Sequence, residues 1–237
     1  IVTGAGKGIG EAIAARFGSV GSSVVVNDVD AASAEAVAQS INAAGGTAIA
    51  AIADVSDSAQ VDTMFEATLA AFGTVDVMVN NAGIATSAEH GEFGFAEWQR
   101  MFAVNVDGPF LTTWAVKNQM IAQRFGRIVN ISSLAAIQLK RNMIHYATTK
   151  AAVVAFTRHT AHAFAEHNVH VNCLAPGLID TDLARSANPD MVEQLIANTP
   201  MGRMGAPNEM AAVVKFLLSE ESSFITGQTI AACGGRT

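Results

Sequence analysis

The sequence predicts one α/β domain built on a parallel sheet that helices cover on both faces. Short, continuously apolar stretches alternate with helical stretches along the 237 residues, and strands buried on both sides of a sheet are apolar throughout. A glycine-rich turn stands between the first apolar stretch and the first helical one. Because no repeat, linker or low-complexity stretch divides the chain, we expect a single domain over residues 1–237.

The first half of the chain alternates strand and helix regularly. Ile1-Val2-Thr3 has the character of a strand end, so we expect a few residues of this strand to precede it. An Ala-rich helix is expected over residues 11–20, and the Gly45-Gly46 pair ends a second helix over residues 31–44. Further strands are expected at residues 23–28, 47–52 and 75–79, with a third helix at residues 58–72.

The second half begins with a long helical stretch over residues 92–124, which carries Asn105 in its interior. An asparagine amide competes for backbone hydrogen bonds, so we expect a local distortion or a polar role there. The polar segment 182–204 is interrupted by prolines and is expected to form a small lid over the carboxyl edge of the sheet. Later strands are expected at residues 127–132, 170–174 and 229–233, and later helices at residues 146–166, 190–198 and 208–219.

Composition excludes several classes of partner. Half of the residues are hydrophobic and 15% are charged, which is enough apolar material for a large core. The net charge of −7 argues against nucleic acid or an anionic membrane as the main partner. Two cysteines make no disulfide framework, which fits a cytoplasmic location. No apolar run is long enough for a membrane span, no leader is apparent, and the histidine spacings do not predict a metal site.

Tyr146 and Lys150 form a candidate acid/base pair. They stand four residues apart in an expected helix, and Ser133 precedes Tyr146 by thirteen residues. Residues four apart share one face of a helix. A free phenol has a pKa of about 10, and a lysine cation within about 4–6 Å favours its ionised form. We therefore expect Lys150 to lower the pKa of Tyr146, although a solvated pair with this spacing also arises by chance.

A second candidate site lies in the glycine turn. Thr3, Gly4, Gly8 and Gly10 fit the pattern T-G-x-x-x-G-x-G, and a strand, a glycine turn and a helix in this order aim backbone amides at a phosphate. Asp28 ends the next expected strand, about 20 residues after the glycines, where a ribose diol would be held. The alternative is that Asp28 only begins a turn.

The candidate motifs follow one another in a familiar order. They are Thr3-Gly4-x3-Gly8-x-Gly10, Asn80-Asn81-Ala82-Gly83, Asn105, Ser133, Tyr146-x3-Lys150 and Pro176-Gly177. In these motifs, across essentially its whole length, the chain resembles the short-chain dehydrogenase/reductase family. The resemblance implies a Rossmann-like, doubly wound parallel sheet of about seven strands, with a nicotinamide cofactor along its carboxyl edge. Cys233 departs from the family pattern, which commonly has an aspartate there.

The resemblance also implies roles for individual residues. Tyr146 would be the general acid/base, Ser133 would hold the substrate oxygen, and Lys150 would bind the nicotinamide ribose. Asn105 would hold a water that passes protons toward Lys150. The residues expected to contact the cofactor are Gly4, Lys7, Gly8, Ile9, Asp28, Asp54, Val55, Asn81, Ala82, Gly83, Tyr146, Lys150, Pro176, Gly177, Ile179 and Thr181.

The predicted function is an oxidoreductase that interconverts a secondary alcohol and a ketone, small molecules, with NAD(H). We expect NAD over NADP because the Asp28 carboxylate would repel a 2′-phosphate more strongly than the hydrated Lys7 would attract it. The alternatives are an NADPH-dependent 3-oxoacyl-thioester reductase and, from another class, a catalytically silent nucleotide-binding scaffold. Two long Ala-rich helices with apolar residues on more than one face predict a homo-oligomer, and the family resemblance suggests a homotetramer.

Overall fold

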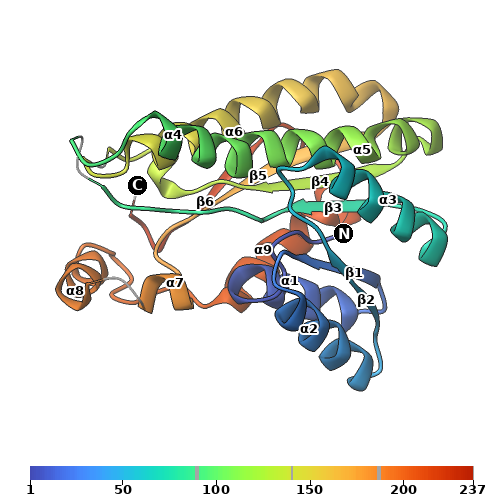
Figure 1. Cartoon of the computed structure of the whole chain (residues 1–237), viewed down its shortest axis with the longest axis horizontal. Coiled ribbons are helices and arrows are strands. Elements are labelled where there is room, and N and C mark those ends of the chain that lie inside the picture. The colour runs from blue at the N-terminus through green and yellow to red at the C-terminus, as the bar shows by residue number, and fades with distance from the viewer. Residues whose placement is uncertain (89–90, 140, 186–187, 237) are drawn as a thin grey trace.

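The computed structural model describes residues 1–88, 91–139, 141–185 and 188–236, and it contains a layer of strands between two layers of helices (Figure 1). The strands are β1 (Ser23–Asp28), β2 (Thr47–Ile52), β3 (Val77–Asn80), β4 (Gly126–Ile131), β5 (Val169–Pro176) and β6 (Thr229–Ala232). The principal helices are α1 (Gly8–Gly18), α2 (Ala31–Ala43), α3 (Ser58–Phe72), α4 (Phe95–Phe102), α5 (Gly108–Gln123), α6 (Ile144–Phe164), α7 (Asp182–Arg185), α8 (Pro189–Ala197) and α9 (Pro207–Leu218).

Residues 1–3 join two groups of parallel strands into one sheet. β1 pairs with β2, and β3 to β6 pair in sequence order. Val2 forms single bridges with Val26 of β1 and Val79 of β3, and its amide donates to the carbonyl of Val25 at 3.0 Å. About seven strands were expected. The described part of the chain contains six, β1 to β6, and residues 1–3 take the remaining place between β1 and β3.

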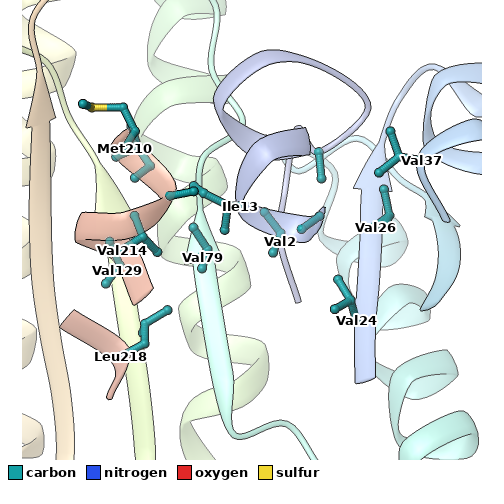
Figure 2. Packing of buried hydrophobic residues seen from close by; sticks show 14 of the residues in the cluster. Val2, Ile13, Val24, Val26, Val37, Val79, Val129, Met210, Val214 and Leu218 are labelled. Carbon is teal, nitrogen blue, oxygen red and sulfur yellow. The ribbon is translucent and has the colours of Figure 1, made fainter. Parts of the chain in front are cut away.

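Each face of the sheet has its own apolar core. On one face, Ile13 of α1, Val37 of α2 and Val214 of α9 pack against the strands around Val2 and Val129 (Figure 2). On the other face, α3, α5 and α6 contribute the buried residues Val61, Met64, Val116, Met120, Ala161 and Phe164. The expected doubly wound α/β arrangement is confirmed.

The mostly helical stretch expected at residues 92–124 is helical over residues 95–123, and it contains one irregularity. Gly94 is the N-cap residue of α4, so the helix begins at Phe95. A π-helical turn, Ala103–Asp107, separates α4 from α5 and contains the buried Asn105. The local distortion expected around this asparagine is thereby confirmed.

The carboxyl ends of the strands gather the candidate residues at one edge of the sheet, because all of its strands run parallel. Asp28 ends β1, Asn81 follows β3, Ser133 follows β4, and Gly177 follows β5. α7 and α8 lie in the segment expected to form a lid, whose residues 186 and 187 are outside the described part of the chain. Among the described residues, no helix has the length and apolar character to cross a membrane.

Candidate active site

α6 and the end of β4 bring three candidate catalytic side chains together. Tyr146 lies in the first turn of α6, and Lys150 follows one turn later with its Nζ 5.8 Å from the centre of the phenol ring. Ser133, two residues beyond the end of β4, has its hydroxyl close enough to the Tyr146 phenol to lower the pKa of that phenol. A serine hydroxyl, a phenol and an ammonium group therefore share one small volume, as the spacing predicted.

The position of Lys150 is fixed from both sides. Its buried Nζ donates a 3.0 Å hydrogen bond to the carbonyl of Ile131, the last residue of β4. The hydroxyl of Ser132 donates to the main-chain carbonyl of Lys150 at 2.8 Å, which ties the strand end to the helix. A β-carbon at Gly83 would lie 3.3 Å from Nζ, so a side chain there would crowd the ammonium group. Ser132 has no signature in the sequence, because a bond to a carbonyl 18 residues later leaves no local pattern.

Burial shifts the pKa of both ionisable groups toward the neutral form. It lowers the pKa of Lys150 from 10.5 to about 8. It also raises the pKa of Tyr146 above its usual value, and the hydrogen bond from Ser133 only partly opposes this. The direction for Tyr146 is opposite to the one expected from the sequence, because desolvation of the phenolate is the largest influence on its pKa.

Asn105 is held by an unusual set of hydrogen bonds. Its Nδ2 donates to the carbonyl of Ile84 at 2.9 Å and to the Thr149 hydroxyl at 3.1 Å. Its Oδ1 accepts from the amide of Ile84 at 2.9 Å and would lie 3.1 Å from a β-carbon at Gly83. The π-helical turn thus directs a buried amide at the chain that leaves β3. Asn105 and Lys150 both approach Gly83 on the side where a β-carbon would stand.

The glycine turn forms a cradle that side chains would fill. Gly4 and Gly8 have φ angles of 59° and 63°, in the left-handed region that favours glycine. A β-carbon at Gly4 would lie 2.8 Å from the Cα of Ala82, and one at Gly8 would lie 3.3 Å from the Cγ2 of Thr181. Lys7 is the N-cap of α1 but makes no side-chain cap, so the first amides of the helix are free to face an anion. This geometry fits a pyrophosphate.

Asp28 lies against the same turn. Its carboxylate accepts hydrogen bonds from the amides of Gly6 at 3.0 Å and Asp30 at 3.1 Å. A β-carbon at Gly6 would lie 2.9 Å from Oδ2 of Asp28. The exposed Lys7 is close enough to Asp30 to contribute to the lowering of its pKa, a smaller effect than that of the hydrogen bonds from Ser33. A carboxylate beside the glycine turn fits a ribose diol.

Asn81 makes contacts that differ from the expected one. Its Nδ2 donates to the carbonyls of Thr3 and Gly4, each at 2.9 Å. The Thr3 hydroxyl in turn accepts from the amides of Asn81 and Ala82, each at 3.0 Å. The Asn81 amide nitrogen therefore holds the glycine turn, which leaves Oδ1 and the main chain for any contact with a ribose.

The remaining predicted residues border the same edge. The Asp54 carboxylate accepts from the hydroxyl of Ser56 at 2.7 Å, and Val55 is buried. Ile179 is buried and bridges to Gly205. Ile9 packs against the first core, and Pro176 is the last residue of β5. A β-carbon at Gly177 would lie 2.8 Å from the Cα of Cys233.

A separate cavity of about 310 Å³ opens near Cys233. Leu178, Ile179, Met201 and Met210 are among its lining residues, and Ser133, Tyr146 and Lys150 are not. We therefore place the active site by its acid/base groups and not by this cavity. Among the described residues, no three side chains of His, Cys, Asp or Glu are grouped so that they would hold a metal ion.

Comparison with known proteins identifies the family. A family profile described as "Enoyl-(Acyl carrier protein) reductase" matches residues 4–237. A subunit, BbsD, of (2S)-[(R)-hydroxy(phenyl)methyl]succinyl-CoA dehydrogenase from Thauera aromatica is 37% identical, and the match covers 100% of this chain and 95% of that protein.

Two solved structures have the same fold. A 3-oxoacyl-[acyl-carrier protein] reductase with bound NAD from Brucella melitensis has a TM-score of 0.91 and 37% identity, over 98% of this chain and 88% of that one. A gluconate 5-dehydrogenase from Burkholderia cenocepacia in complex with NADP and tartrate has a TM-score of 0.94 and 34% identity, over 99% of this chain and 92% of that one.

The fold and these comparisons define an NAD(P)-dependent oxidoreductase with a Rossmann-like sheet. The chain belongs to the short-chain dehydrogenase/reductase family.

Proposed function

We propose that the protein interconverts a secondary alcohol and a ketone with NAD(H), and that Tyr146 is the general acid/base. The observation that carries this proposal is the placement of Ser133 and Lys150 beside the Tyr146 phenol, at the sheet edge that also holds the glycine turn. These groups supply a proton donor, a hydroxyl for the substrate oxygen and a cation within one small volume.

Each group has one task in this proposal. The nicotinamide, when bound, supplies or accepts the hydride. Tyr146 donates a proton to the oxygen of a ketone during reduction and removes it from an alcohol during oxidation, while Ser133 orients that oxygen. Lys150 holds the nicotinamide ribose, and Asn105 positions a water that links Lys150 to solvent. The segment 182–204 covers the substrate as a lid.

The proposed cofactor contacts follow the sheet edge. Gly4, Gly8 and Ile9 lie against the pyrophosphate, and Asp54 and Val55 meet the adenine. Asn81, Ala82 and Gly83 border the adenine-side ribose through their main chain, and Ile179 and Thr181, after Pro176 and Gly177, meet the carboxamide. The cradle at Gly4 and Gly8 supports this assignment, since a β-carbon at either position would be crowded.

NAD is the preferred cofactor in this proposal. The Asp28 carboxylate already lies against the glycine turn, where a 2′-phosphate would approach it. Lys7, the opposing charge, is exposed and lies near Asp30, whose carboxylate competes for it. Two like unit charges about 4 Å apart repel by about 1–4 kcal/mol in water or at intermediate dielectric, which corresponds to about ten- to thousand-fold discrimination.

The cofactor assignment is tested by kcat/KM for NAD and NADP with one substrate. We expect a preference for NAD in the wild type and a smaller preference in Asp28→Ala, which removes the repulsion and keeps Lys7. Lys7→Ala is the matched control and should widen the gap. An NADP preference in the wild type would contradict the proposal and favour the acyl-thioester alternative.

The substrate remains a choice between a simple ketone and a 3-oxoacyl thioester. The names of the reductase and of the succinyl-CoA dehydrogenase subunit above refer to acyl groups carried on acyl carrier protein or CoA, whereas gluconate 5-dehydrogenase is named for gluconate. Steady-state turnover against a panel of ketones, alcohols and 3-oxoacyl thioesters, followed through NADH absorbance, separates these substrate classes. Absence of turnover with every member would favour the nucleotide-binding scaffold.

We also propose that the protein is a homotetramer in the cytoplasm. Phe110 and Trp114 of α5 stack at 4.4 Å, are 40% and 41% exposed, and contact Phe156 of α6. An exposed aromatic cluster on two long helices suits a two-fold contact with a second copy. Cys173 and Cys233 are buried free thiols, as a reducing compartment allows.

Light scattering at micromolar concentration tests the assembly. We expect the mass of a tetramer for the wild type and a smaller mass for Trp114→Glu, because a buried charge would oppose the contact. A monomeric wild type would overturn this part of the proposal.

A further inference from the structure

Two loops meet beside the candidate acid/base. One leaves β3 after Gly83, and the other leads into α6 just before Tyr146. The amide of Ala88 donates to the carbonyl of Asn142 at 3.0 Å, and the Asn142 side chain donates to the Ser87 hydroxyl at 2.7 Å. These bonds hold the wall of the substrate region, as it is assigned in the proposed function, against the helix that carries the phenol.

The buried member of this contact is His145. It precedes Tyr146 and is fully buried, and its ring stacks on Phe93 with the ring centres 4.5 Å apart. Its Nε2 lies 2.7 Å from the Thr86 hydroxyl. That hydroxyl also donates to the Glu97 carboxylate at 2.9 Å. Glu97, Thr86 and His145 thus form a chain of hydrogen bonds that runs from α4 to α6.

With a neutral imidazole, the hydrogens in this chain have one consistent arrangement. A threonine hydroxyl has one hydrogen, and a carboxylate only accepts. Because Thr86 gives its hydrogen to Glu97, its oxygen accepts from His145, which must carry its proton on Nε2. The Nδ1 atom is then an acceptor, and it is buried without a hydrogen-bond partner.

An unpaired buried acceptor is unfavourable, and an apolar ring at this position would avoid it. The unpaired Nδ1 therefore reduces stability locally, and the histidine differs from an apolar ring in having a hydrogen-bond donor at Nε2. A residue that served only to pack the core would gain from replacement by phenylalanine, which keeps the stack on Phe93.

We infer that His145 is a positioning residue for the substrate, a role that rests on the proposed function. Through Thr86 it fixes the loop after Gly83 at the distance from Tyr146 that the reacting ketone requires. His145 is not among the residues that the proposed function assigns to the cofactor, so its effect should fall on the substrate and not on NAD(H).

The test compares His145→Phe, His145→Gln, Thr86→Val and the double variant His145→Phe/Thr86→Val. We expect the KM for the best ketone to rise about three- to ten-fold in His145→Phe and in Thr86→Val, the range that loss of one hydrogen bond gives. kcat and the KM for NAD(H) should stay near the wild-type values. His145→Gln places an amide donor near the position of Nε2 and should restore most of the loss.

Two further readouts separate positioning from simple stability. The double variant should be no worse than Thr86→Val, because that single variant already lacks the bond that His145→Phe removes. The Tm of His145→Phe should equal or exceed that of the wild type. Thr63→Val, on α3 and bonded only within its own helix, is the control and should leave every constant unchanged. Additive effects, or a lower Tm with an unchanged KM, would overturn the inference.

Hydrogen exchange keeps the inference testable if no substrate turns over. In His145→Phe and Thr86→Val, the amides of residues 84–88 should exchange faster than in the wild type and in His145→Gln. Faster exchange supports the fixed loop even where the proposed function fails, and unchanged exchange overturns it.

Discussion

The groups around Tyr146 and the helices of the segment that we propose as a lid are built in opposite ways. The first region, the catalytic floor, comprises Asn105, Ser132, Ser133, Tyr146 and Lys150, whose polar groups are held by strand ends, helix α6 and the π-helical turn. The second, the cap, comprises α7 and α8. α8 has no buried residue, and the Asp180–Arg185 ion pair beside α7 is exposed.

The two regions are suited to different tasks, the reaction step and the choice of substrate. A side chain with several buried hydrogen bonds has one geometry, which a repeated reaction step requires. An exposed helix tolerates substitution, because few neighbours constrain it. In the proposed function, the floor carries the reaction and the cap selects the substrate.

The largest expected effect is that of Tyr146→Phe. The ring remains and only the hydroxyl is lost, so turnover should fall by about 10²–10⁴-fold, as is typical for loss of a general acid/base. Affinity for NADH, measured by fluorescence titration, should hardly change. Turnover within a few-fold of the wild type would exclude Tyr146 as the proton donor.

Lys150→Met should remove activity and stabilise the fold. Burial lowers the pKa of Lys150 from 10.5 to about 8, and each pKa unit corresponds to about 1.4 kcal/mol. The variant removes the cost of burying this charge, and it also removes the hydrogen bond to Ile131, which contributes about 1 kcal/mol. The free energy of unfolding should therefore rise by about 2 kcal/mol. The folded pKa is the lower one, so the gain is full below pH 8 and disappears as pH rises toward 10.5. Denaturant unfolding at pH 7 and pH 10 measures it, and a less stable variant at pH 7 would contradict the account.

The raised pKa of the phenol can be measured directly, because Tyr146 is the single tyrosine of the chain. Phenolate absorbance should titrate above pH 10 in the wild type, since burial outweighs the other influences on the pKa. Ser133→Ala should shift the pKa of Tyr146 further up, because the serine hydrogen bond lowers it. A downward shift in this variant would show that Ser133 does not stabilise the phenolate.

The junction between the cap and the body should be sensitive to acid. Glu209, in the first turn of α9, accepts from Arg203 at 2.7 Å and from the amide of Ala206 at 2.7 Å, and its pKa is lowered to about 2, mainly by the bond from Arg203. Its stabilising contribution is present above the usual pKa of 4.5 and is lost as pH falls toward 2. Glu209→Gln should lower Tm slightly at pH 7 and by less at pH 2.5.

The matched control for this variant is Glu221→Gln, an exposed carboxylate in the short helix after α9. It should have a smaller effect on Tm at pH 7. Equal losses in the two variants would show that the Arg203 pair does not secure the junction.

Met191→Ala, in the cap, should have the smallest effect on stability. The side chain is 39% exposed, so the free energy of unfolding should change by no more than about 0.5 kcal/mol. If α8 contributes to selection, the KM for the substrate changes while the KM for NAD(H) does not. A change of several kcal/mol in the free energy of unfolding would show that α8 is as tightly packed as the catalytic floor.

The sequence predicted the parts of the site that depend on strand ends and helix spacing. Parallel strands place Asp28, Ser133 and Gly177 at one edge whatever the details of packing. Asn105 was singled out because its amide is unfavourable within a helix, and a π-helical turn is found there. These inferences needed only local chemistry and the order of the elements.

The rest depended on tertiary contacts. Neither the bond from Ser132 to the carbonyl of Lys150 nor the one from His145 to Thr86 has a local signature. The pKa of Tyr146 was expected to fall, because the effect of a neighbouring charge is visible in a sequence and the extent of burial is not. The hydrogen bonds from Asn81 Nδ2 to the carbonyls of Thr3 and Gly4 have no local signature either, and the sequence predicts only a cofactor contact for Asn81.

The π-helical turn at Ala103–Asp107 has a consequence for how this part of the chain can change. Such a turn widens the helix locally by about one residue, which corresponds to an angular offset of about 100° between the faces of α4 and α5. Deleting one residue from it would restore a regular helix with better backbone bonding. It would also rotate Phe110 and Trp114 away from Phe156 and turn the Asn105 amide off Ile84. The irregularity therefore acts as a spacer, and a single-residue deletion here should be far more damaging than most substitutions.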